Sequence, residues 1–307
     1  MAAIPKPEET TVTRIYKSYE DANTPRFSRR LGASQIGRSC MREIYYSFRW
    51  AKTSLFEGRM LRLFQKGYLE ETIIAADLKR AGVQFLALDE STGQQFEFND
   101  IHGHMVAKLD GVCCGLVEAP TTWHTCEFKT ANQKAFDKIQ KEGVQKAQPE
   151  HFAQMQIGLH MAELDRCLYL VVNKNTEEIY IERVKLDKKE VKRIRQRAQE
   201  IVFGREAPDR IGTGPAHWEC KFCNFHGICY SEELAEKNCR TCVYSTPLEG
   251  EDGVWSCDNF DCVIDHDKQK VGCDGHKYRP EMCSDAVNAC QNVLGARVMV
   301  NEENLSV

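Results

Sequence analysis

The stretch LDGVCCGLVEAPTTWHTCEFKT, residues 109–130, decides how this chain is interpreted. Its residues predict two strands joined by a loop, at His104–Val112 and Trp123–Thr130. Side chains two positions apart on a strand share a face, so Glu127 and Lys129 point the same way. If the strands pair antiparallel, Asp110 lies close to both. An ion pair at the rim of a sheet is the simpler explanation of these charges, and features elsewhere in the chain decide between the two.

The composition of the 307-residue chain excludes some classes of protein. The 41 Lys and Arg against 45 Asp and Glu give a formal net charge of -4, so any nucleic-acid-binding surface must be local. No apolar run approaches the length needed to cross a bilayer, and the first residues lack the pattern of a secretory signal. We therefore expect a cytoplasmic protein without a membrane partner.

The periodicity along the chain predicts an α/β or α+β core. A long helix is expected at Phe56–Arg80, and shorter ones at 131–141 and 149–163. Further strands are expected at Val83–Leu88, Gln94–Phe98, Cys167–Asn173 and Glu178–Val184. Asp187–Phe203 is expected to be a basic amphipathic helix, whose charged face either grips phosphates or is simply solvated.

Side chains on the flanking helices can complete a catalytic site around the hairpin. Mg²⁺ and Mn²⁺ prefer oxygen ligands, and phosphodiester hydrolysis also needs a cation near the attacking water or the phosphate. The hairpin supplies both kinds of group. Glu70 adds a further acid, with Glu71 as its less favoured substitute, and Gln154 can orient water or phosphate. Singly, each of these is more simply a solvated helix residue; their order along the chain indicates a site.

The order helix acid, strand acid, Glu-x-Lys, helix glutamine resembles that of the PD-(D/E)XK nucleases of the RecB family. The matching stretches are GYLE at 67–70, KLDG at 108–111, CEFKT at 126–130 and AQMQ at 153–156. The resemblance covers roughly residues 30–235, and Gly158 stands where the family usually has a tyrosine. It implies a restriction-endonuclease-like core, with a central mixed sheet flanked by helices.

The resemblance also implies a metal-dependent DNA exonuclease. Its ligands for Mg²⁺ or Mn²⁺ would be Glu70, Asp110, Glu127 and the backbone of Phe128. Its catalytic residues would be Asp110, Glu127, Lys129 and Gln154. Such enzymes act in DNA recombination or repair, in phage DNA processing or in CRISPR adaptation. The implied setting is a bacterial or phage-infected cytoplasm, with a single-strand annealing or CRISPR adaptation protein as partner; oligomerisation is left open.

Cysteine is unusually abundant, with 15 residues, most of them after residue 219. Without a secretory signal, this density indicates metal ligation rather than disulfides. The motif ECKFCNFHGICY spaces Cys220, Cys223 and Cys229 as C-x₂-C-x₅-C, which needs a fourth ligand. In the iron–sulfur branch of the RecB family the fourth ligand lies upstream, and Cys40 is similar in place and flanks. The resemblance therefore implies a 4Fe–4S cluster. The alternative is a zinc knuckle completed by His226 or Cys239.

A second set of cysteines follows, with the ribbon-like spacing of structural zinc: Cys239, Cys242, Cys257 and Cys273. The spare candidate ligands are Cys262, His266, His276 and Cys283. Because this segment has few aliphatic residues, we expect it to need a metal to fold. The predicted domains are an N-terminal arm at 1–30, a nuclease domain with its cluster at 31–235 and a zinc-binding module at 236–307.

Two other classes of protein stay open. One is a non-catalytic nucleic-acid-binding protein whose Fe–S and zinc sites are purely structural, and the other is a zinc-dependent transcriptional regulator. The intact Asp and Glu-x-Lys set argues against the first. The second has neither a helix-turn-helix pattern nor Cys₂His₂ spacing to support it.

Overall fold

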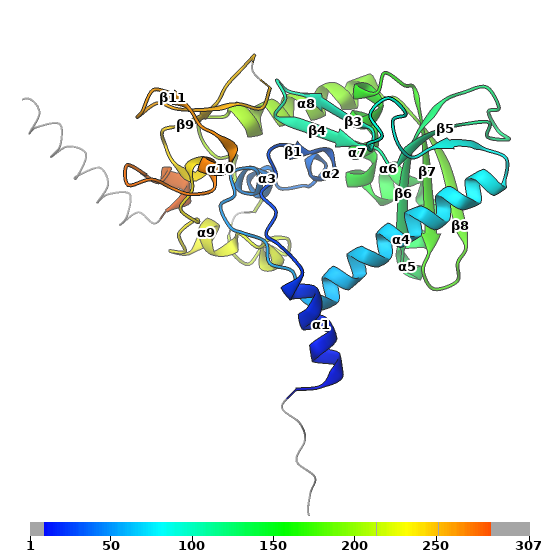
Figure 1. Cartoon of the computed structure of the whole chain (residues 1–307), viewed down its shortest axis with the longest axis horizontal. Coiled ribbons are helices and arrows are strands. Elements are labelled where there is room, and N and C mark those ends of the chain that lie inside the picture. The colour runs from blue at the N-terminus through cyan, green and yellow to red at the C-terminus, as the bar shows by residue number, and fades with distance from the viewer. Residues whose placement is uncertain (1–8, 213, 251, 284–307) are drawn as a thin grey trace, which may run out of the picture.

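The computed structural model describes residues 9–212, 214–250 and 252–283 (Figure 1). They form a mixed α+β fold, in which a five-stranded sheet flanked by helices lies beside a cysteine-rich lobe. The short helices α2 (Ala33–Ile36) and α3 (Met41–Phe48) lie between the two. The mixed α+β class expected from the sequence is confirmed. Within the described ranges, no helix is long and apolar enough to span a membrane.

The five-stranded sheet has the order β2-β5-β6-β7-β8. Its strands are β2 (Gln84–Leu86), β5 (Gly111–Cys114), β6 (His124–Ala131), β7 (Arg166–Asn173) and β8 (Ile179–Lys185). β6 and β7 pair in parallel and the other neighbours pair antiparallel, so the sheet is mixed. The expected antiparallel pairing of the hairpin is therefore confirmed as the β5–β6 pair.

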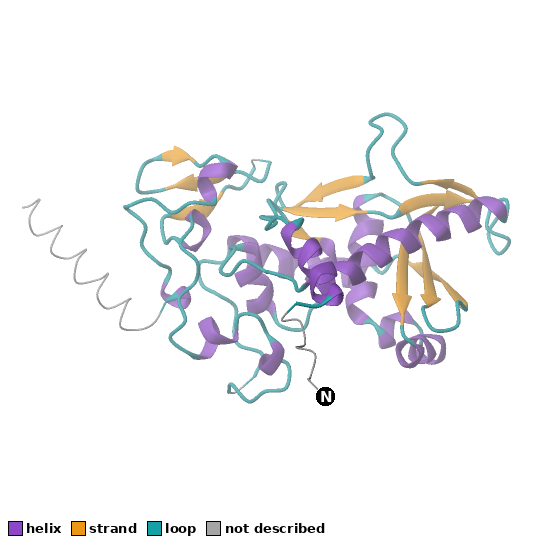
Figure 2. Ribbon diagram, turned by 60° about the horizontal axis from the view of Figure 1, so that its bottom comes forward, coloured by secondary structure: helices purple, strands orange, loops and turns teal. Residues whose placement is uncertain are grey.

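Helices cover both faces of this sheet (Figure 2). Cys167, Tyr169 and Val171 of β7 belong to a core with the helices α5 (Gln133–Glu142), α6 (Val144–Ala147) and α7 (Pro149–Met161). The alternate residues of β7 belong to a second core with α4 (Gly58–Arg80), on the opposite face. A strand buried on both faces must be apolar along its buried length, which explains the continuous run CLYLVV at 167–172.

The single strand expected at 104–112 is wrong, because the structure divides it between two sheets. β4 (Met105–Lys108) pairs with β1 (Leu31–Gly32) and β3 (Glu97–Asp100), whereas β5 begins at Gly111. The backbone breaks at Gly111, where φ is 152° and an added Cβ would lie 2.5 Å from the Phe85 ring. Only glycine tolerates this approach. The break places Asp110 between the two sheets, next to β6.

The predicted helices are all present. The one expected at Phe56–Arg80 is α4, which begins at Gly58 because its first N–H donates to the Glu20 carboxylate at 2.6 Å. The helices expected at 131–141 and 149–163 are α5 and α7. The basic helix is α8 (Lys188–Phe203), and Asp187 caps it by accepting from two backbone N–H groups.

The segment expected as an N-terminal arm contains a helix, α1 (Thr11–Asp21), which packs on α4. The cysteine-rich lobe holds a small antiparallel sheet of β9 (Ser245–Pro247), β10 (Trp255–Cys257) and β11 (Cys262–Val263), with the short helices α9 (His226–Tyr230) and α10 (His266–Gln269). Short hydrogen-bonded elements of this kind carry little apolar periodicity, so the sequence gives few signals for them.

The lobe shares a hydrophobic core with the residues around α2 and α3. Trp255 of β10 is fully buried and packs against Phe48 of α3, with 5.4 Å between ring centroids. Arg240 is also buried, and its guanidinium lies 3.8 Å from the centroid of the Trp50 ring. The same guanidinium donates to the backbone carbonyls of Ser28, Arg29 and Phe48. Trp255, Ile264 and Met282 are therefore packed into the same core as residues 31–51.

Candidate active site and cysteine clusters

Asp110, Glu127 and Lys129 come together where β5 starts beside β6. The Phe128 N–H donates to Oδ2 of Asp110 at 2.7 Å. Glu127 and Lys129 share one face of β6, and Nζ of Lys129 donates to Oε1 of Glu127. Since the N–H and C=O of one strand residue point to the same side, the Phe128 carbonyl is also directed toward Asp110. The hairpin thus gathers the groups that its sequence predicted.

Burial controls the charge state of these side chains. Glu127 is 3% exposed, and burial raises its pKa from 4.5 to about 7, an effect that Lys129 opposes and Asp110 reinforces. Burial raises the pKa of Asp110 as well. Burial alone would lower the pKa of Lys129, but attraction to Glu127 and Asp110 outweighs it and raises that pKa. Lys129 is therefore a charged ammonium at pH 7.

The helix acid that faces the hairpin is Glu71. Burial, followed by repulsion from Asp110, raises the pKa of Glu71 from 4.5 to about 7. Burial also raises the pKa of Glu70. The largest charge effect on that pKa comes from Glu177, which lies outside the hairpin. Consecutive residues of a helix are turned by about 100°, so only one of the two can face β6. The structure thus brings the less favoured candidate to the site and leaves Glu70 beside it.

Three carboxylates therefore meet one ammonium, because Glu71, Asp110 and Glu127 share the site with Lys129. Three negative charges and one positive charge leave a net charge of -2 when all are ionised. Carboxylate and carbonyl oxygens are the ligands that Mg²⁺ and Mn²⁺ prefer, so the donor set fits a divalent cation. In the described part of the chain no three His, Cys, Asp or Glu side chains already converge as a metal site. In place of a cation, Nζ of Lys129 donates to one carboxylate oxygen of Glu127.

Helix α7 brings the predicted glutamine to the same place. Gln154 lines a small cavity together with Glu127 and Cys167. The neighbouring Gln156 has a different role, because its amide donates to the Lys185 carbonyl and its oxygen accepts from a backbone N–H at the start of α8. Gln154 is thus the glutamine that can reach water or substrate beside Glu127.

His151 and Tyr169 border the site but are absent from the predicted set. Nδ1 of His151 lies 2.8 Å from the Tyr169 hydroxyl, and Tyr169 is the register partner of Glu127 on β7. Burial, followed by the charge of Lys129, lowers the pKa of His151 to about 4, so the ring is neutral at pH 7. The available signal was that His151 lies one helical turn before Gln154 on the same face. A single helical histidine is too common for that spacing to be decisive.

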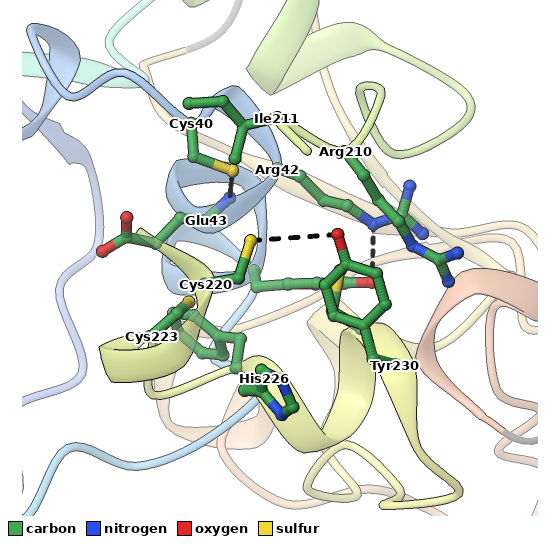
Figure 3. A pocket seen from close by; sticks show the side chains of 12 residues that line it. Cys40, Arg42, Glu43, Arg210, Ile211, Cys220, Cys223, His226 and Tyr230 are labelled. Atoms are coloured by element: carbon green, nitrogen blue, oxygen red, sulfur yellow. Dashed lines mark hydrogen bonds between the residues drawn. The ribbon is translucent and has the colours of Figure 1, made fainter. Parts of the chain in front are cut away.

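The four cysteines predicted to hold an Fe–S cluster line one small cavity (Figure 3). Cys40 caps the N-terminus of α3, where its Sγ accepts from the Glu43 N–H at 3.4 Å. Figure 3 shows the sulfur atoms of Cys40, Cys220 and Cys223 around the same space, with Cys229 completing the lining. Burial raises the pKa of Cys40, and it raises that of Cys223 to about 11. The raised pKa values favour the neutral thiols of Cys40 and Cys223, whereas a bound metal would favour their thiolates.

The alternative fourth ligands lie differently. His226 lines the cluster cavity, but its Nε2 is 3.2 Å from the Pro215 carbonyl. Cys239 instead lines the second cavity, in the cysteine-rich lobe. Cys40 and the three loop cysteines thus line one cavity, and of the two alternative ligands only His226 lines it as well.

The second predicted set, Cys239, Cys242, Cys257 and Cys273, also lines one small cavity. Burial, and then the four neighbouring cysteines of the lobe, raise the pKa of Cys239 to about 11. Among the spare ligands, His276 lines this cavity and Cys262 is close to Cys239. His266 packs edge-on against Trp50 instead, and Cys283 donates to the Arg279 carbonyl. Four thiols and one imidazole, that of His276, thus share the lining of this cavity.

Comparisons with known proteins give weak structural similarity and no family. No family model matches the chain, and no curated protein matches it. The crystal structure of SSO0001 is similar at a TM-score of 0.42 and 15% identity, covering 74% of this chain and 100% of that one. The alkaline exonuclease LHK-Exo from Laribacter hongkongensis is similar at a TM-score of 0.41 and 16% identity, covering 60% and 90% of the two chains. These values assign no function, so the functional proposal rests on the geometry of the site.

Proposed function

We propose that the protein is a Mg²⁺- or Mn²⁺-dependent deoxyribonuclease that hydrolyses phosphodiester bonds at DNA ends. The observation that carries this proposal is the imbalance of charge at the hairpin, where the buried carboxyl group of Glu127 and the partly exposed carboxyl groups of Glu71 and Asp110 face one ammonium, that of Lys129. A structural ion pair would match charges one to one, because unpaired buried charge is costly. Excess negative charge on oxygen ligands is what a site for a divalent cation requires.

The charge of each residue determines the catalytic role that we assign to it. Glu71, Asp110, Glu127 and the Phe128 carbonyl would hold a divalent cation, which would supply Lewis-acid chemistry by lowering the pKa of a water molecule and offsetting phosphate charge. Lys129 stays protonated, so it stabilises negative charge on the phosphate and orients the water rather than removing its proton. Its present bond to Glu127 keeps the ammonium within reach of the site.

The two cysteine cavities support further proposals about metal centres. We propose a 4Fe–4S cluster on Cys40, Cys220, Cys223 and Cys229, and a structural zinc on Cys239, Cys242, Cys257 and Cys273. Each set lines a single cavity, although the first joins residues far apart in the chain. The cluster would tie the start of α3 to the loop around α9. Anaerobically purified protein should be brown and contain iron, sulfide and zinc; a colourless, iron-free and fully active protein would contradict the cluster.

The nuclease proposal is tested with end-labelled linear DNA and circular DNA, incubated with Mg²⁺, Mn²⁺ or EDTA. Cleavage of linear DNA alone, dependent on the cation, is the expected result. Cleavage of both forms would indicate an endonuclease. DNA binding without cleavage under every cation would favour the non-catalytic nucleic-acid-binding protein, and would contradict the proposed reaction. A function in recombination, repair, phage DNA processing or CRISPR adaptation follows only if ends are the substrate.

A further inference from the structure

An aromatic groove lies between α1 and the first half of α4. Its aromatic lining consists of Tyr19, Phe56, Phe64 and Tyr68. Phe64 is 39% exposed and Tyr68 59% exposed. The core contacts of α4 begin only at Ile74. The fold therefore does not explain why this half of α4 is aromatic.

The groove is an ordered feature. Tyr19 donates its hydroxyl to the Gln65 side chain at 2.6 Å, and Phe56 packs edge-on against Phe64 with 5.1 Å between centroids. At its end the two helices cross so closely that a Cβ on Gly58 would lie 2.1 Å from the Tyr16 carbonyl. These contacts hold the rings of Tyr19, Phe56 and Phe64 in place before any ligand binds.

The lining of the groove carries one cation and no acidic side chain. That cation is Arg26, whereas the exposed Arg59, Arg62 and Lys66 belong to another side of α4, since successive helix residues are turned by about 100°. Between positions 58 and 69 the helix contains neither Asp nor Glu. Aromatic rings on which bases stack, combined with cations that follow the phosphates, are the features of sites for single-stranded nucleic acid.

We propose that this groove binds single-stranded DNA and leads it to the hairpin. The direction rests on the proposed nuclease function, because α4 itself continues to Glu71 at the site. With about 1.5 Å of rise per residue, Phe64 lies roughly 10 Å from Glu71 along the helix axis. A strand stacked on Tyr68 and Phe64 would therefore lie next to the carboxylates.

The test measures binding of fluorescein-labelled (dT)₂₀ by anisotropy, using the full-length Asp110→Asn protein so that no cleavage interferes. Tyr68→Ala and Phe64→Ala should each weaken binding roughly 5- to 100-fold, which is the range for loss of one base–aromatic stack. Tyr68→Phe keeps the ring and should bind as the parent does. Leu69→Ala is the matched control, because Leu69 is also 59% exposed on α4 but does not line the groove.

The remaining outcomes are decisive as well. Unchanged binding by Tyr68→Ala and Phe64→Ala overturns the groove proposal, whether or not the protein cuts DNA. Equal losses for (dT)₂₀ and for a 20-base-pair duplex also overturn it, since paired bases cannot stack on the rings. If sedimentation shows an oligomer that both Tyr68→Ala and Leu69→Ala dissociate, the face is a contact between copies of the chain. Because binding is the readout, absence of nuclease activity would not mimic any of these results.

Discussion

Glu71 and Glu70 are neighbours on α4 that face different surroundings, and they provide a matched pair of variants. Glu71 is coupled to Asp110 and Lys129, whereas Glu70 is influenced by Glu177. Glu71→Gln should lower the cleavage rate roughly 10- to 100-fold and raise the Mg²⁺ concentration needed for half-maximal rate. Glu70→Gln should leave both unchanged. Steady-state rates on end-labelled DNA across a Mg²⁺ titration provide the measurement, and a larger loss for Glu70→Gln would contradict the assignment.

Variants of Lys129 and Asp110 distinguish a catalytic role for these residues from a structural ion pair. Asp110→Asn removes a metal-binding charge, so cleavage should collapse and excess Mn²⁺ should restore little. Lys129→Ala removes no ligand, so metal and DNA should still bind while the rate falls by about 10²–10³. Melting temperatures are measured beside the rates. A destabilised but fully active Lys129→Ala would show that the pair is structural, and the catalytic assignment would fail.

At the scale of elements, three different segments bring carboxylates together. This arrangement predicts an unusual pH dependence of the free energy of unfolding. The folded pKa of Glu127 is about 7, above its ordinary value of 4.5, so between these values the folded state binds more protons than the unfolded state. Without a divalent cation, the contribution of Glu127 to stability is complete below pH 4.5 and is lost as the pH rises through about 7.

The comparison of the parent protein with Glu127→Gln isolates this effect from other titrating groups. Without added Mg²⁺, the parent should lose roughly 1–3 kcal/mol of unfolding free energy relative to the variant between pH 5 and pH 8. Added Mg²⁺ should remove the difference, because the cation favours the ionised carboxylate. Urea unfolding at several pH values provides the measurement. A parent that gains stability with pH relative to the variant would mean that Lys129 alone satisfies Glu127.

The elements that the sequence predicted well are those with a strong period and clear ends. Pro149 opens α7, Asp187 caps α8, and the apolar run of β7 is buried on both faces. The strand at 104–112 was mispredicted because periodicity does not reveal that Gly111 breaks the backbone between two sheets. The alternation of side chains along a strand predicted the part of the candidate site that lies on the hairpin. The choice of Glu71 over Glu70 depends on how α4 is rotated against β6, which is a tertiary property.

At the scale of the whole molecule, the core that joins the cysteine-rich lobe to α2 and α3 bears on the expected domain boundary. A zinc module with its own core would unfold separately from the nuclease domain. Here Trp255 and Met282 of the lobe are fully buried in one cluster with Ile36 and Ile44. Shared burial of this kind couples the stability of the parts, so we expect one cooperative unfolding transition for the full chain.

Arg240 gives the sharpest test of that coupling, because it links the two parts without contributing a metal ligand. Its guanidinium is buried and donates to three backbone carbonyls of residues 28–48. Arg240→Met keeps the apolar stem but removes the donor to the Arg29 and Phe48 carbonyls, which should cost roughly 3 kcal/mol or more. The Ser28 carbonyl keeps a second donor, the indole N–H of Trp50. Calorimetry should show the single transition of the parent shifted down as a whole, with zinc and iron contents unchanged. Arg80→Met, at an exposed position on α4, should not move it. If Arg240→Met instead splits the trace into two transitions and lowers only one, the lobe folds as a separate domain and the boundary near residue 236 is real.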